Sequence, residues 1–203
     1  AGADIIEARA RLAELGDFSQ TARQAYVDAG FEVQTTRLAL DGVPVLQTDP
    51  VSYAVTVEAL AREYGFEFVS LGPAPEAMLS CLPEIFAATQ AVFATAHIVD
   101  PASGVIDGAA VRGAARVIRE ASHIGAGFGN LRFAALAHVR PGTPFFPAAY
   151  HDGGAPAFAI ATEAADLAVA AGEGASDLAD AHRCLRDRIE AEAVRLVTVA
   201  DRL

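Results

Sequence analysis

The sequence predicts an α/β fold built around a parallel or mixed sheet. A helical pattern, a glycine and a strand pattern follow one another twice within the first seventy residues, which is the alternation typical of layered α/β proteins. Four strand candidates alternate with helical segments along the whole chain. The chain has 203 residues and is 53% hydrophobic. It can therefore bury a sizeable core.

The first seventy residues show the helix, strand and capping patterns most clearly. Residues 5–29 carry apolar side chains at helical spacing, and Gly30 follows them as a C-terminal cap. Residues 31–38 alternate and are rich in β-branched side chains, so they are predicted to form a strand. Asp49 or Ser52 is placed to cap a helix that ends just before a glycine.

Later segments continue the same alternation. Further strands are predicted over residues 66–71, 91–98 and 131–139, and further helices over residues 75–89, 107–122, 158–171 and 176–203. Pro83 must either kink its helix or stand at a helix start. The strand over 131–139 is almost continuously apolar at its centre. We therefore expect it to be a central strand with both faces covered.

The charge balance excludes some classes of partner. The formal net charge is −11 and the pI is about 4.8. Nucleic acid and anionic membrane surfaces are therefore not expected to bind, because both require clustered basic side chains. All 15 basic residues are arginine. The absence of lysine excludes Schiff-base chemistry and a P-loop lysine within this chain.

The cysteines and the chain ends indicate the cellular context. Cys81 and Cys184 are far apart and show no metal-binding spacing, and no signal peptide or membrane-length apolar run is present. We expect a cytoplasmic protein. The chain begins without methionine and ends inside a predicted helix. We therefore expect 1–203 to be one α/β domain that forms a fragment of a longer protein and is poorly stable alone.

A stiff loop after the fourth strand carries the first group of candidate site residues. It contains three prolines, each of which fixes the backbone φ angle, and it delivers Tyr150, His151 and Asp152 to one place. A histidine can act as general acid, general base or ligand near neutral pH. A structural role, with the His151 ring bonded to backbone, is the alternative.

A second group of candidates is basic or amidic. Asn130 and Arg132 would share one face of the strand over 131–139, and Arg140 follows that strand. A buried arginine requires an acceptor. We therefore expect Arg132 to bind Glu163, Asp152 or an anion.

Arg37 lies at the end of the first predicted strand, where α/β sheets place ligand-binding groups. Solvated side chains on an edge strand are the alternative. His97 ends an apolar strand, but no histidine or carboxylate spacing indicates a metal site.

Five segments give the chain a family resemblance: FEVQTTRLA, GPAPE, PEIFAATQAVFATA, GFGNLRFAALAHVRPGTPFFPAAYHDG and AFAIATEAADL. Together and in this order they resemble the domain-of-unknown-function 711 family, of which the chain covers the front half. The resemblance implies part of a pyruvate formate-lyase-like α/β barrel with helices outside the strands. It does not imply radical catalysis, because the Arg-Val-x-Gly-aromatic motif is absent. It supplies no reaction and no cofactor.

These observations lead to two functional hypotheses. In the first, the protein is an enzyme for a small anionic or polar metabolite bound at the strand ends. His151 would then be the acid or base, oriented by Tyr150 and Asp152, and the arginines and Asn130 would hold the anion. In the second, it is a non-catalytic binding or oligomeric assembly protein, and the Pro-Phe-Phe-Pro segment is a packing or subunit-contact element. Expected partners are a small-molecule ligand, the remaining half of the polypeptide or another chain, and further copies in a homo-oligomer.

Overall fold

The computed structural model describes residues 2–42 and 49–203, which form two compact units. The first unit comprises Ala1–Asp17 and Thr35–Ala159, and the second comprises Phe18–Gln34 and Ile160–Leu203. The first unit contains the sheet. The second unit contains the two C-terminal helices.

The sheet of the first unit is parallel, which confirms the predicted α/β class. Its strands are β1 (Arg37–Ala39), β2 (Phe68–Pro73), β3 (Val92–His97) and β4 (Phe133–Leu136). Within the described residues their spatial order is β1-β2-β3-β4. Every neighbouring pair is parallel, so all four carboxyl ends lie at one edge of the sheet.

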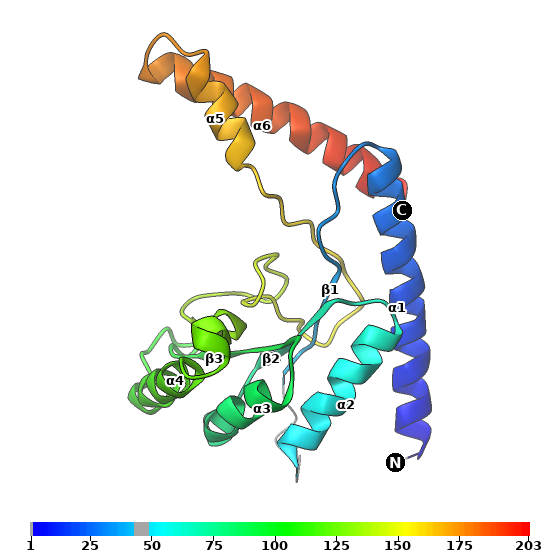
Figure 1. Cartoon of the computed structure of the whole chain (residues 1–203), viewed down its shortest axis with the longest axis vertical. Helices are drawn as coiled ribbons and strands as arrows, with labels where there is room; N and C mark the ends of the chain where they lie inside the picture. The colour runs from blue at the N-terminus through cyan, green and yellow to red at the C-terminus, as the bar shows by residue number, and fades with distance from the viewer. Residues whose placement is uncertain (1, 43–48) are drawn as a thin grey trace. The chain divides into compact units, whose positions relative to one another are not determined.

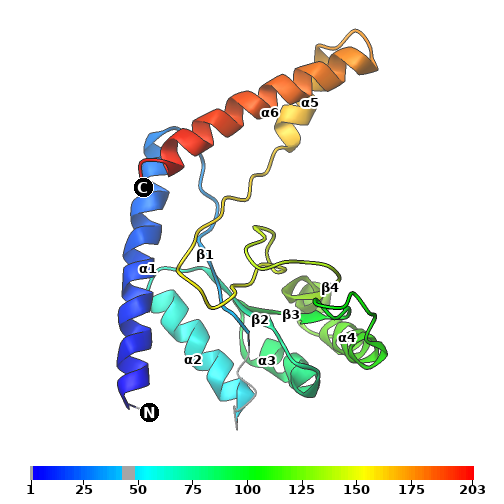
Figure 2. The same ribbon diagram turned by 180° about the vertical axis from the view of Figure 1, so that it is seen from behind.

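Helices follow the strands and gather on one side of the sheet (Figures 1 and 2). They are α2 (Pro50–Glu63), α3 (Leu82–Ala88) and α4 (Gly108–Ala121). Two 3₁₀ segments, η1 (Glu76–Cys81) and η2 (Gly125–Arg132), precede α3 and β4. The segment after β4 runs on the other side of the sheet (Figures 1 and 2).

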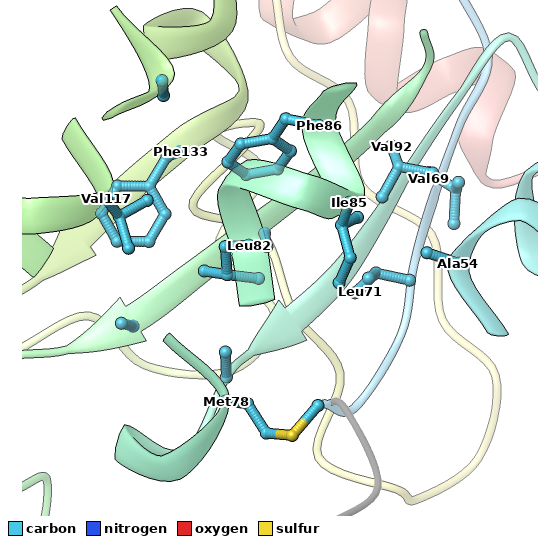
Figure 3. Close-up of a cluster of buried hydrophobic side chains, with 14 of the residues drawn as sticks. Ala54, Val69, Leu71, Met78, Leu82, Ile85, Phe86, Val92, Val117 and Phe133 are labelled. Carbon is cyan, nitrogen blue, oxygen red and sulfur yellow. The ribbon is translucent and has the colours of Figure 1, made fainter. Parts of the chain in front are cut away.

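The hydrophobic core lies between the sheet and these helices. Figure 3 shows Leu82, Ile85 and Phe86 of α3 packed against side chains of the strands. Phe86 is only 1% exposed. The strand side chains in the same cluster are Leu38, Val69, Leu71, Val92, Ala94, Ala96 and Phe133. These are alternate residues of each strand, so the intervening side chains point to the opposite face.

The helix-start signals in the sequence are confirmed. Asp49 caps α2 by accepting a hydrogen bond from the Ser52 amide (3.0 Å). Asp107 caps α4 in the same way. Pro83 stands in the first turn of α3, where its missing amide donor costs nothing. The single helix predicted over 75–89 is therefore η1 followed by α3.

The second unit contains the end of α1 (Gly2–Asp28), together with α5 (Ala165–Glu173) and α6 (Leu178–Ala200). The Tyr26 hydroxyl donates to the Leu196 carbonyl (3.1 Å), which ties α1 to α6. The helix predicted over 158–171 begins too early, because residues 158–164 are not helical. The β-branched Ile160 and Thr162 disfavour a helical start there.

Two strand predictions need correction. The segment 31–38 pairs with β2 only from Arg37 onward. Just before that point, the Thr36 amide and hydroxyl bind the Glu67 side chain and the Gly65 carbonyl instead. β4 is shorter than the predicted 131–139 strand and lies at an edge of the sheet rather than at its centre. Ala135 is exposed, so the prediction that both faces are covered is wrong.

Candidate ligand site on the loop face of the sheet

The face of the sheet opposite α2, α3 and α4 carries the polar side chains. We call this surface the loop face and define it by Arg37, Phe68, Ser70, Phe93, Thr95 and His97, which alternate with the core residues of their strands. Ser70 and Thr95 are both 0% exposed. Buried polar side chains of this kind are uncommon on a sheet face.

The proline-rich loop, residues 140–152, covers the loop face. The Phe146 ring packs edge-on against Phe93, with 4.7 Å between ring centroids. The Ser70 hydroxyl donates to the Pro147 carbonyl (3.3 Å). The Tyr150 ring packs edge-on against the His97 ring at 5.4 Å. The loop thus contacts β2 through the Pro147 carbonyl and β3 through the rings of Phe146 and Tyr150.

The main chain fixes both ends of this loop. The His151 amide donates to the Leu40 carbonyl just after β1 (3.0 Å), and the Gly142 amide donates to the Tyr150 carbonyl (3.0 Å). The Tyr150 hydroxyl also donates to the Val139 carbonyl (3.0 Å), and burial raises the pKa of this phenol. The loop therefore returns from the end of β4 to the end of β1.

His97 is the titratable group best placed for chemistry on the loop face. It ends β3 at the carboxyl edge of the sheet and is partly buried beside Tyr150. Its ring nitrogens have no hydrogen-bonding partner within residues 2–42 and 49–203. Burial lowers the pKa of His97, and the nearby Asp100 carboxylate opposes this effect only in part. A neutral imidazole with a free nitrogen can accept a proton.

We expect the pKa of His97, measured by NMR titration of the ring protons, to lie below the ordinary histidine value of 6.5. The unfolded chain then binds more protons than the folded chain as the pH falls through that value. This contribution to stability is complete above pH 6.5 and decreases on acidification. A His97→Gln variant should lose this part of the pH dependence. An upward shift of the His97 pKa would contradict the burial argument.

Thr95 lies on the same face of β3, two residues before His97. Its side-chain oxygen is buried and has no hydrogen-bonding partner among the described residues. Leaving a buried hydroxyl unpaired costs about 1–3 kcal/mol. Buried hydroxyls without a partner are uncommon in native structures.

His151 forms a local turn instead of facing the loop face. Its Nδ1 accepts from the Gly153 amide (3.0 Å), so its Nε2 carries the proton and donates to the Ala155 carbonyl (3.0 Å). The Asp152 carboxylate accepts from the Gly154 amide (3.0 Å) and lies 3.9 Å from the His151 ring. Both ring nitrogens are thus occupied by backbone, as in the structural alternative. Of the predicted triplet, only Tyr150 contacts the loop face.

Arg132 is buried, as predicted, but its acceptors are backbone carbonyls. One terminal nitrogen donates to the Thr89 carbonyl (2.8 Å), and the other donates to the Phe86 carbonyl. The guanidinium also lies 5.0 Å from the centre of the Phe86 ring. Burial lowers the pKa of Arg132, and the Glu58 carboxylate counteracts this. Arg132 therefore caps the C-terminus of α3, where carbonyl groups lack helical partners.

The carboxylates proposed as partners of Arg132 are engaged elsewhere. Glu163 accepts from the Gln34 side chain within the second unit (2.8 Å), and Asp152 accepts from its own turn. Asn130 and Arg132 also do not share a strand face, because both belong to η2. η2 leads into the amino end of β4. α/β sheets usually place ligands at the opposite edge. The carbonyl contacts of Arg132 support a structural role for that residue, whereas the buried Oδ1 of Asn130 has no hydrogen-bonding partner among the described residues.

Arg37 and Arg140 are both exposed. The guanidinium of Arg37 lies 5.3 Å from the centre of the Phe146 ring and 5.9 Å from that of Phe68. Arg37 thus belongs to the loop face, but it is the first residue of β1 and lies at the amino end of the sheet, so its predicted position at the ligand-binding end of the strand is wrong. Arg140 opens the proline-rich loop.

The surface elsewhere offers a less suitable place for a ligand. An open depression of about 520 Å³ lies at the amino ends of β2 and β3 and is lined by Arg62, Gly65, Phe66, Glu67, Phe68, Gln90 and Ala91. It is shallow and lies at the wrong edge for an α/β site. Within the described residues, no group of three or more His, Cys, Asp or Glu side chains is arranged to hold a metal ion.

The sequence singled out the proline-rich loop and His151, whereas the structure places a different histidine, His97, against Tyr150 of that loop. His97 and Thr95 alternate with alanines in the segment Phe93–His97, so their shared face was readable from the sequence. Nothing in the sequence showed that the proline-rich loop would cover that face.

The fold and this surface define an α/β protein with a polar sheet face beneath a proline-rich loop. The family described as Uncharacterised ACR (DUF711) matches residues 3–203, and the chain belongs to this family. Comparison with curated proteins gives no significant match. Among the described helices, none has the length and apolar character needed to cross a membrane.

Proposed function

We propose that this protein binds and chemically transforms a small polar or anionic metabolite on the loop face of its sheet. The observation that carries the proposal is the buried hydroxyl of Thr95, for which residues 2–42 and 49–203 supply no hydrogen-bonding partner. It lies beside the neutral imidazole of His97 at the carboxyl edge, where α/β proteins bind ligands. The hydroxyl and the imidazole together supply a hydrogen bond and a proton acceptor to one bound molecule.

The chemistry assigned to this site is proton transfer. His97 would take a proton from the ligand, and Tyr150 would hold the imidazole in place through ring packing. Thr95 would fix the ligand by a hydrogen bond. His151 and Asp152 would serve the reaction indirectly, by shaping the turn that anchors the loop. Entry of a ligand requires the proline-rich loop to move from the loop face.

We also propose that the sheet is part of a larger α/β barrel. The four parallel strands run in sequential order with their helices on one face, as strands do in α/β barrels. The loop face would then be the barrel interior, and the remaining strands would come from the rest of the polypeptide or from another chain. The cytoplasm is the proposed location, since both cysteines are free thiols.

Replacing Thr95 by valine tests the proposed site directly. Valine keeps the shape and removes the unpaired hydroxyl, so the free protein should become more stable by about 1–2 kcal/mol. The same variant should lose ligand binding. A thermal-shift screen with a panel of small hydroxy and carboxylic acids supplies the ligand, because a compound at a hundred times its Kd adds about 2.7 kcal/mol of stability.

Thr89→Val is the matched control. Thr89 is also buried, but its hydroxyl donates to the Ile85 carbonyl (2.7 Å). Its loss should therefore destabilise the protein by about 1 kcal/mol and leave ligand binding unchanged. If Thr95→Val destabilises the free protein as Thr89→Val does, the hydroxyl has a structural partner and the proposal loses its basis.

A second candidate function is assembly through the proline-rich loop. Phe146 is an internal packing element, but the adjacent Phe145 is 72% exposed. An exposed aromatic side chain on a stiff loop is suited to a subunit contact in a homo-oligomer. If Phe145→Ser lowers the molar mass measured by light scattering, assembly gains support. An unchanged mass would remove it.

A further inference from the structure

Three contacts orient the Arg37 side chain, and its terminal nitrogens have no hydrogen-bonding partner within residues 2–42 and 49–203. Its Nε donates to the Thr35 hydroxyl (2.8 Å). The plane of the guanidinium rests near two rings, those of Phe146 and Phe68. The side chain is exposed, so the two terminal nitrogens face accessible space.

The charge balance makes this arrangement unusual. The chain contains 26 acidic and 15 basic residues, so acidic partners outnumber arginines. Nevertheless, no carboxylate lies within ion-pair distance of Arg37 in the part of the chain that the structure describes. The nearby Glu67 instead accepts from the Thr36 amide (3.3 Å). An arginine anchored at Nε presents a planar fork that matches the two oxygens of a carboxylate or phosphate group.

We propose that Arg37 forms a second site, specific for a carboxylate or phosphate group, and that an anion bound there holds the proline-rich loop on the sheet. The link is the Phe146 ring, which contacts both the guanidinium and Phe93. When the loop leaves the sheet, Arg37 loses the Phe146 ring and keeps only Phe68 and Thr35 as contacts. An anion that binds Arg37 more tightly while Phe146 packs near the guanidinium must therefore favour the state in which the loop covers the sheet. This site does not depend on catalysis at His97.

Amide hydrogen exchange measures the effect on the loop. The His151 amide donates to the Leu40 carbonyl outside the loop, so its exchange reports loop opening, whereas the Gly142 amide bonds Tyr150 within the loop. We expect malonate or inorganic phosphate, compared with chloride at equal ionic strength, to slow exchange of the His151 amide about tenfold at ten times the Kd. Comparing the two probes tells which anion the site prefers. No slowing by either probe would overturn the proposal.

Three variants locate the site. Arg37→Gln should abolish the slowing, while Arg140→Gln, which removes an exposed arginine of the loop itself, should keep it. Arg37→Lys retains the charge but not the fork, so it should show clearly weaker protection than the wild type. If the anion slows amide exchange in Arg37→Gln as strongly as in the wild type, the assignment is overturned. If Arg37→Gln fails to fold, the same result in Arg37→Lys overturns it. Thr95→Val should keep the anion effect, which separates this site from the one proposed above.

Discussion

Replacement of Gly72 by alanine is expected to lower the free energy of unfolding by about 3–4 kcal/mol, the sum of a backbone term and a steric term. Gly72 has a φ of +79°, a region that L side chains rarely adopt. A Cβ atom there would lie 2.7 Å from the Leu40 carbonyl oxygen and 2.8 Å from the Gly42 nitrogen. Both contacts are with backbone, which cannot rotate away.

Gly142→Ala is the matched control for this variant. Gly142 has a nearly identical φ of +78°, but a Cβ atom there would meet nothing within 4 Å. It should therefore cost only the backbone term, about 1–2 kcal/mol. Urea unfolding followed by circular dichroism compares the two variants. Equal losses would show that the chain after β1 moves away from Gly72 at no cost.

The Gly72 variant should also affect the candidate site. The close approach at Gly72 positions Leu40, whose carbonyl accepts the His151 amide and anchors the proline-rich loop. Displacement of Leu40 should weaken that bond. Faster exchange of the His151 amide in Gly72→Ala than in Gly142→Ala would demonstrate this connection.

Replacement of Arg132 by methionine is expected to destabilise the first unit by about 3 kcal/mol, because hydrogen bonds from a charged donor contribute about 1.5–3 kcal/mol each. The change leaves the carbonyls of Phe86 and Thr89 buried without their donor. It also removes the positive charge beside Glu58, which accepts from the amides that precede β3. Methionine fills much of the same volume, so the effect reports the polar contacts.

Two further variants show which property of Arg132 matters. Arg132→Lys keeps the charge but cannot reach both carbonyls in a planar fork, so we expect an intermediate loss. Arg140→Met changes an exposed arginine and should stay within about 0.5 kcal/mol of the wild type. If Arg132→Met unfolds at the wild-type urea concentration but loses affinity for an anion, the ligand-binding interpretation of Arg132 would be restored.

The sequence predicted the element types well where the signal is local. The cap at Asp49, the position of Pro83 and the strand at β3 all depend on residues close together in the chain. Parallel pairing also followed from the alternation of helices and strands. Predictions failed at the boundaries, as at residues 158–164, where local preferences are weak and nothing in the sequence marks a helix start.

The same distinction between local and long-range contacts holds for the candidate site. The sequence alone determined that a rigid, aromatic loop follows the fourth strand, that Arg132 is buried, and that no lysine chemistry is available. Only the tertiary structure decided which groups meet. Arg132 binds the Thr89 carbonyl at the end of α3, which lies 43 residues away in the chain. Both ring nitrogens of His151 form hydrogen bonds within its own turn. The loop instead covers Thr95 and His97, because packing of Phe146 and Tyr150 on the sheet depends on contacts between distant segments that no local pattern records.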